Sequence, residues 1–203
     1  MKNDVGKVYE ILGLAGSGKT TLINALKKNE NLIFNTNKKI GIYLISHIPT
    51  ALYILYKTKN IIYARVYLRL QSSIKYFMDE KNEGHKKLIF DQGPIYIISI
   101  LIKEVPSLEA VLLKELNSIL KYYTGVIYLE TSLDTLHNRI HNRVRKHRVK
   151  DMDIKSEMDF LNEYIMIYKK ILDICLANQV SVNKIDTDRN DIMAVERLAL
   201  DFI

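Results

Sequence analysis

Cysteine, proline and glycine are all scarce in this sequence. The 203 residues include one cysteine, which excludes an intramolecular disulfide and a cysteine-rich zinc site. That residue, Cys175, stands in an apolar run, so we expect a small buried side chain. Three prolines and eight glycines predict long regular elements without a disordered linker, and the length suits one compact domain over residues 1–203.

A targeting segment and a clean membrane span are missing as well. Residues 1–7 do not show the charged-then-apolar pattern of a secretory signal, and we expect a cytoplasmic protein. The most apolar stretch, residues 40–56, contains polar residues near its middle and falls short of the roughly 20 apolar residues that span a membrane. A net charge of +7 favours anionic partners, so contact with an acidic membrane surface through residues 40–70 stays an alternative.

Short apolar runs alternate along the chain with segments of helical periodicity. This alternation predicts an α/β fold, a three-layer α/β/α sandwich around a central parallel sheet of five strands. The expected strands are residues 8–12, 39–45, 87–91, 125–130 and 180–186. The expected helices are residues 21–28, 49–78 as two helices divided near 57–60, 95–102, 108–123, 133–144, 160–176 and 191–202.

The turn after the first expected strand carries the strongest motif. Residues 13–20 read Gly-Leu-Ala-Gly-Ser-Gly-Lys-Thr, in which the glycines let backbone N–H groups turn toward phosphate oxygens at the start of a helix. Lys19 would reach the β- and γ-phosphates of a nucleoside triphosphate, and the Thr20 hydroxyl would ligate Mg²⁺. The residues predicted to bind ATP here are Gly13, Ala15, Gly16, Ser17, Gly18, Lys19, Thr20 and Thr21.

A carboxylate ends the apolar run of residues 87–91. Ligand sites of parallel sheets open at the carboxyl ends of strands, so Asp91 should point toward the bound phosphates. It would hold Mg²⁺ through water or accept the proton of the attacking hydroxyl. A cap or turn aspartate before Gly93 and Pro94 is the alternative without a catalytic role.

The segment from His137 to Arg148 is rich in arginine. Arg139 and Arg143 are one helical turn apart, and arginine suits the clamping of a phosphoryl group in transfer. The alternatives are a solvated basic face and a nucleic-acid patch. Because the segment lacks interleaved aromatic residues, we expect no nucleic-acid partner.

A helix should begin just before this segment. Thr131 and Asp134 have the spacing of a capping box. His137 and His141 have the four-residue spacing of a zinc pair, but no third ligand is evident in the sequence, so we assign them no metal. An apolar seam of the same helix is formed by Leu133, Leu136, Ile140 and Val144.

The order of these parts resembles the P-loop nucleoside and nucleotide kinase superfamily, in the branch of thymidylate and deoxynucleoside kinases. The matching pieces are residues 13–20, Asp91, residues 128–143 and residues 185–188. The resemblance implies that residues 137–152 form a mobile lid over ATP and that residues 187–189, Thr187 among them, border the adenine. The lid arginines that it implies are Arg139, Arg143, Arg145 and Arg148.

The chain departs from thymidylate kinases around its acceptor site. Where those enzymes carry Asp-Arg and an aromatic residue, this chain has Asp-Gln-Gly at residues 91–93. The acceptor pocket should lie among residues 44–76, with Arg69 as its first candidate. Other polar or aromatic candidates there are His47, Tyr53, Tyr56, Arg65 and Gln71.

Taken together, the motifs predict an ATP- and Mg²⁺-dependent phosphotransferase acting on a nucleoside, a nucleoside monophosphate or another small acceptor such as a sugar. A nucleotide-binding module without transfer is one alternative. A GTPase is another, because residues 183–186 read Asn-Lys-Ile-Asp and match the guanine-reading pattern. Only 17 residues follow Asp186, too few for the helix, strand and base-contacting loop that GTPases place after this motif.

Overall fold

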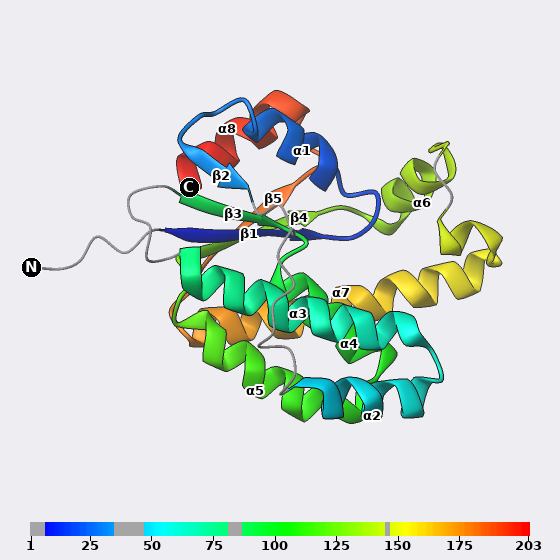
Figure 1. The fold of residues 1–203 in the computed structure, drawn as a ribbon. Coiled ribbons are helices and arrows are strands. Elements are labelled where there is room, and N and C mark those ends of the chain that lie inside the picture. Colours follow the sequence, from blue (N-terminus) through cyan, green and yellow to red (C-terminus); the bar gives the residue numbers. More distant parts are fainter. Residues whose placement is uncertain (1–6, 35–46, 81–86, 145–146) are drawn as a thin grey trace, which may run out of the picture.

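Five short segments of the chain form one parallel sheet. The structure is a computed structural model that describes residues 7–34, 47–80, 87–144 and 147–203. The strands follow the order β2-β3-β1-β4-β5, and each neighbouring pair is parallel, which confirms the predicted five-stranded α/β fold (Figure 1). Their bounds are β1 Val8–Gly13, β2 Leu32–Phe34, β3 Lys87–Asp91, β4 Gly125–Glu130 and β5 Ser181–Asp186.

Helices cover both faces of this sheet. One face carries α1 (Lys19–Leu26) and α8 (Ile192–Phe202), which pack against each other. The opposite face carries four helices, and a fifth, α2, packs against α3 (Figure 1). These are α2 Ile48–Thr58, α3 Ile61–Glu80, α4 Pro94–Glu104, α5 Glu109–Leu120 and α7 Ile154–Ala177.

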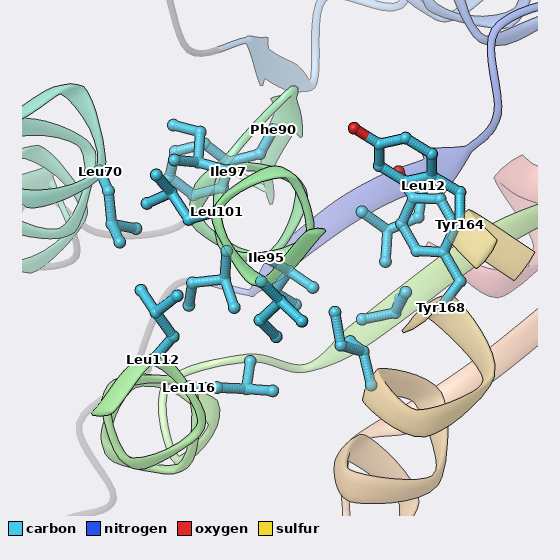
Figure 2. Close-up of a cluster of buried hydrophobic side chains, with 14 of the residues drawn as sticks. Leu12, Leu70, Phe90, Ile95, Ile97, Leu101, Leu112, Leu116, Tyr164 and Tyr168 are labelled. Carbon is cyan, nitrogen blue, oxygen red and sulfur yellow. The ribbon is translucent and has the colours of Figure 1, made fainter. Parts of the chain in front are cut away.

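Alternate strand residues enter two separate hydrophobic cores. Tyr9 and Ile11 of β1 pack with the buried residues of α1 and α8, whereas Val8 and Leu12 belong to the larger core on the opposite face. Burial on both faces explains why the strands are continuous apolar runs rather than alternating ones. Cys175 lies in the larger core, fully buried as expected. Figure 2 shows part of that core, including Leu12, Phe90, Ile95, Leu101, Leu112, Leu116 and Tyr168.

The second strand and the start of α7 differ from the sequence prediction. The expected strand at residues 39–45 lies outside the described residues, and β2 at Leu32–Phe34 was not predicted because three residues are too few for a period to show. The helix α7 begins at Ile154, six residues earlier than expected, where the Asp153 side chain accepts a hydrogen bond from the Ser156 N–H.

Within the described residues, no helix combines the length and the apolar character that a membrane crossing requires.

The short helix α6 (Leu133–His141) lies beyond the carboxyl end of the sheet (Figure 1). The hydroxyl of Ser132, rather than that of Thr131, accepts the capping hydrogen bond from the Thr135 N–H, so the predicted capping residue was wrong by one position. The helix also ends at His141. Val144, which we expected in the apolar seam, is fully exposed.

Candidate active site

The glycine-rich turn between β1 and α1 has the backbone of a phosphate-binding loop. Gly13, Gly16 and Gly18 have φ angles of 147°, 96° and 92°, and Gly18 is the N-terminal cap of α1. Side chains other than glycine rarely adopt such angles, which explains the spacing of the motif. The Ser17 hydroxyl oxygen is buried in this loop without a hydrogen-bond partner among the described residues. A turn of this kind at a helix N-terminus suits an anionic ligand.

Lys19 extends back over the same turn. Its ammonium group donates hydrogen bonds to the carbonyl oxygens of Gly13 and Leu14, the second at 2.8 Å. Burial lowers the pKa of Lys19 to about 8, the nearby carboxylate of Asp91 opposes that shift, and the charge of Arg143 adds to it. The structure therefore places Lys19 within electrostatic reach of both Asp91 and Arg143, and a shared phosphate site stays a prediction.

Two cavities flank the phosphate loop. The first, of about 460 Å³, runs from the loop toward α3, α4 and α7. The second, of about 440 Å³, lies on the side of α8 and the loop after β5. Of the predicted loop residues, Gly13, Ala15, Lys19 and Thr20 line the first cavity, Ser17 and Thr21 line the second, and Gly16 and Gly18 line both.

The carboxyl end of β3 presents two polar side chains. Asp91 pairs in register with Ile11, two residues before Gly13, so it lies beside the phosphate loop as predicted. Asp91 is half-buried but does not line the first cavity, whereas its neighbour Gln92 does. Gln92 has a φ angle of 58°, an unfavourable backbone conformation for this residue type, and such strain is common at binding sites. Sequence reasoning had not singled out Gln92.

Arg139 lies on the side of the second cavity. Its guanidinium donates to the Thr187 carbonyl oxygen at 2.9 Å, to the Thr187 hydroxyl at 3.1 Å and to the Gly16 carbonyl oxygen at 3.4 Å. The Thr187 hydroxyl is also hydrogen-bonded to that of Thr131 at 2.7 Å. Arg139 thus ties α6 to the phosphate loop and to the loop after β5. Its predicted catalytic role stays a prediction.

The other arginines of the predicted lid lie in different places. Arg143 follows the end of α6 and lines both cavities. Arg148 lines only the first cavity, so the structure places it away from the predicted adenine side. Arg145 lies outside the described residues. Arg143 and Arg148 therefore lie in different parts of the site.

A network of side chains holds Arg148 in the wall of the first cavity. Its guanidinium donates to Glu104 at 2.8 Å and to the Tyr164 hydroxyl at 3.2 Å, and it lies over the Phe160 ring at 4.2 Å. Burial lowers the pKa of Arg148, but the hydrogen bond and charge of Glu104 outweigh that effect and raise it overall. Glu104, Phe160 and Tyr164 were not predicted, because they belong to α4 and α7, which are distant in sequence from residues 44–76.

The expected acceptor region contributes a different set of residues from the one proposed. Ile62, Tyr63 and Val66 of α3 line the first cavity. Tyr53 and Tyr56 are exposed, and neither they nor Arg69 line that cavity. The remaining candidates of this region, His47, Arg65 and Gln71, do not line it either, and the Gln71 amide donates to Glu115 instead. Residues 44–46 lie outside the described residues.

A buried glutamate supports the turn after β3. Glu10 of β1 is fully buried, and its carboxylate accepts hydrogen bonds from the N–H groups of Ile95 at 3.1 Å and Tyr96 at 2.7 Å, and from the Tyr123 hydroxyl at 2.8 Å. Burial raises the pKa of Glu10 to about 7, although these hydrogen bonds oppose the shift. Glu10 thereby fixes the N-terminus of α4, from which Tyr96 lines the first cavity. Its position in an apolar strand was the only signal in the sequence.

The Asn-Lys-Ile-Asp sequence does not form a base-reading loop. Residues 183–186 lie within β5 and pair with β4 from Ile127 to Glu130. The Asn183 amide donates to the Leu198 carbonyl oxygen of α8 at 3.3 Å, and the Asp186 carboxylate accepts hydrogen bonds in the following turn. The predicted rejection of the GTPase motif therefore agrees with its place in the fold.

Comparison with solved structures shows the class of fold. The chain is similar to deoxyadenosine kinase from M. mycoides, described with bound dATP, with a TM-score of 0.59 and 17% sequence identity over 96% of this chain and 98% of that one. The protein therefore has the fold of a P-loop nucleoside kinase, as the resemblance of the motifs implied. The sequence matches no protein-family model, and no curated protein is significantly similar to it.

Proposed function

We propose that the protein is a kinase that transfers the γ-phosphate of ATP to a hydroxyl group of a nucleoside. The observation that supports this proposal is the position of the phosphate loop between two cavities, with Arg143 lining both. A donor nucleotide in the second cavity and an acceptor in the first would meet at Lys19 and Arg143. A module that only binds nucleotide needs no second cavity of this kind.

The residues beside the loop fit a magnesium ion. Thr20 offers a hydroxyl oxygen at the start of α1, and Asp91 offers a carboxylate close enough to affect the pKa of Lys19. Magnesium prefers such oxygen ligands, so Thr20 and Asp91 would hold it beside the bound phosphates, where it would supply positive charge to the transferring group. The ATP and Mg²⁺ requirement is thus part of the proposal.

The first cavity favours an uncharged aromatic acceptor. Tyr63, Tyr96 and Tyr164 offer rings against which a base can stack, and Gln92 offers an amide for hydrogen bonds to a base or a sugar. Arg148 is already paired with Glu104, and the other cations among the described lining residues, Lys19 and Arg143, lie at the phosphate-loop end of the cavity. A nucleoside therefore suits the cavity better than a nucleoside monophosphate.

In the proposed reaction, the acceptor hydroxyl oxygen forms a bond to the γ-phosphorus. The bond from that phosphorus to the β–γ bridging oxygen breaks, and ADP leaves with the electron pair. Lys19 and Arg143 stabilise the charge on the transferring group, as preorganised cations can. Asp91 accepts the hydroxyl proton, or it would help to hold Mg²⁺ while the proton passes to the transferred phosphate. The variant Asp91→Asn should change the pH profile of kcat in the first case and raise the Mg²⁺ requirement in the second.

The decisive experiment is an acceptor screen by mass spectrometry with ATP and Mg²⁺. We expect a phosphorylated nucleoside from the wild type and none from Lys19→Ala at unchanged thermal stability. ATP binding without any phosphorylated product among nucleosides, nucleoside monophosphates and sugars would instead support a regulatory module. A clear preference for GTP as the bound or hydrolysed nucleotide would support a GTPase.

A further inference from the structure

Two histidines of α6 and one glutamate of α7 converge outside both cavities. The Glu157 Oε2 atom lies 3.1 Å from His137 Nδ1 and 2.9 Å from His141 Nε2. The three potential ligand atoms all lie within 4.8 Å of one another. The third ligand that the sequence did not reveal is therefore present, 16 residues after His141.

Glu157 is buried in a way that hydrogen bonds alone do not explain. The side chain is 1% exposed, and both imidazoles contact the same carboxylate oxygen, Oε2. The other oxygen, Oε1, is buried without a hydrogen-bond partner among the described residues. A buried carboxylate usually has its charge compensated or its oxygens fully hydrogen-bonded. A cation bound beside Glu157 would compensate this charge.

We propose that His137, His141 and Glu157 bind a divalent transition-metal ion of the zinc class. Two imidazole nitrogens and one carboxylate oxygen are a ligand set that zinc accepts, and magnesium does not favour the nitrogens. Zinc–ligand bonds of about 2.0–2.1 Å in a tetrahedron separate the ligands by roughly 3.3 Å, which is close to the two His–Glu separations, and the two imidazole nitrogens lie within 4.8 Å of each other. His137 and His141 side chains are 29% and 34% exposed, which leaves a fourth position for water.

The backbone holds these residues in register. His137 and His141 are one turn apart on α6, and Glu157 lies in the first turn of α7. Arg139 projects elsewhere, to Thr187 and Gly16. The metal site and the phosphate site therefore use different residues of α6.

The metal ion would join the two ends of one segment of the chain. This segment, residues 142–156, carries Arg143 and Arg148, which line the cavities. Lys150 already donates hydrogen bonds to the His141 carbonyl oxygen at 3.2 Å and to that of Arg143, so it also connects the start of this segment to a later part of it. Metal binding would further restrict the motion of the two ends of this segment. The site itself does not depend on kinase activity.

The test is a titration of the purified full chain, freed of metal with a chelator, with Zn²⁺ and with Co²⁺. We expect one saturable equivalent of Zn²⁺ per chain and the intense visible absorption of tetrahedral Co²⁺. His141→Asn and Glu157→Gln should weaken binding by about 100-fold or more, because even changes to outer-shell partners cost about 10–100-fold. His47→Asn, a histidine of another region, is the matched control and should bind as the wild type does.

Two further variants separate this proposal from the kinase proposal. Lys19→Ala should retain the Zn²⁺ equivalent, since Lys19 is not a ligand. The conservative Glu157→Gln should keep a cooperative thermal transition, which shows that loss of metal is not loss of fold. Absence of a saturable Zn²⁺ equivalent in the wild type, or unchanged binding by folded His141→Asn and Glu157→Gln, would overturn the proposal. The cluster would then be a hydrogen-bonded His–Glu–His network.

Discussion

The two cavities beside the phosphate loop are built by different means. The second cavity includes the backbone turn of residues 16–18 and the loop after β5, which Arg139 ties together through carbonyl oxygens, beside residues of α6 and α8. The first is walled by side chains of α3, α4 and α7, including Tyr63, Glu104 and Tyr164. Backbone geometry serves any triphosphate, whereas a side-chain wall can be specific for one acceptor. The donor side should therefore be general and the acceptor side particular.

Arg143 lines both cavities, so its substitution should have the largest effect and gives the strongest test of the contrast between them. Arg143→Ala should lower kcat by about 10²–10³-fold, the usual effect of losing one preorganised donor to the transition state. The KM values for ATP and acceptor should change much less. Steady-state kinetics with both substrates varied measures this. Arg197→Ala, an exposed arginine of α8, is the control; a higher ATP KM at normal kcat would assign Arg143 to the donor side alone.

Glu10, which supports the N-terminus of α4 beside the first cavity, should make the stability of the fold depend on pH. Because its folded-state pKa of about 7 exceeds the ordinary value of 4.5, the folded state holds an extra proton between these values. The free energy of unfolding should therefore fall by about 3 kcal/mol as pH rises from 4.5 to 7.

The measurement is urea unfolding of wild type and Glu10→Gln at several pH values. Glu10→Gln should lose this contribution, so the difference between the two proteins should itself vary with pH. Glu30→Gln, at an exposed glutamate, should run parallel to the wild type. Parallel curves for Glu10→Gln as well would show that the Glu10 pKa is not raised.

Arg148 distinguishes the structural assignment from the one implied by family resemblance. Arg148→Ala removes the partner of Glu104 and the cation over Phe160, so the acceptor KM should rise about tenfold while the ATP KM stays within about twofold. Glu104→Gln should act in the same direction and more weakly. If the ATP KM rises instead, Arg148 belongs to a lid over the donor, as the resemblance implied.

Thr187 offers the smallest and most selective change. Thr187→Val keeps the shape of the side chain but removes the hydroxyl that Arg139 and Thr131 contact. Because Arg139 keeps its hydrogen bond to the Thr187 carbonyl oxygen, the net loss should be about 0.5–1.5 kcal/mol, so the ATP KM should rise about two- to tenfold with the acceptor KM unchanged. Nucleotide titration by calorimetry checks this directly. An effect on the acceptor alone would reverse the assignment of the two cavities.

The sequence predicted the parts of the fold and site that depend on local order. Residues 13–20 carry their own turn chemistry, and the alternation of apolar runs and helical periods was enough to predict a parallel sheet and four of its five strands, although β2 was missed. Asp91 followed from its place at the end of a strand. These features need only neighbours along the chain.

Most of the missed residues depend on contacts between distant parts of the chain. Glu10 meets the N-terminus of α4 across 85 or more residues, Glu104 meets Arg148 across 44, and Glu157 meets His137 across 20. Gln92 was missed for another reason, because its backbone conformation has no signature in a single sequence. In a single sequence, a charged residue whose partner lies on another helix cannot be distinguished from a solvent-exposed surface residue. The distinction appears only once the packing of the helices is known.

The position of Arg143 between the cavities also implies thermodynamic linkage. A side chain that borders two ligands couples their binding, and the coupling must be reciprocal: the factor by which ATP changes the affinity for the acceptor equals the factor by which the acceptor changes the affinity for ATP. Under the proposed function, one guanidinium group at the end of a short helix would thus make the occupancy of each cavity depend on that of the other.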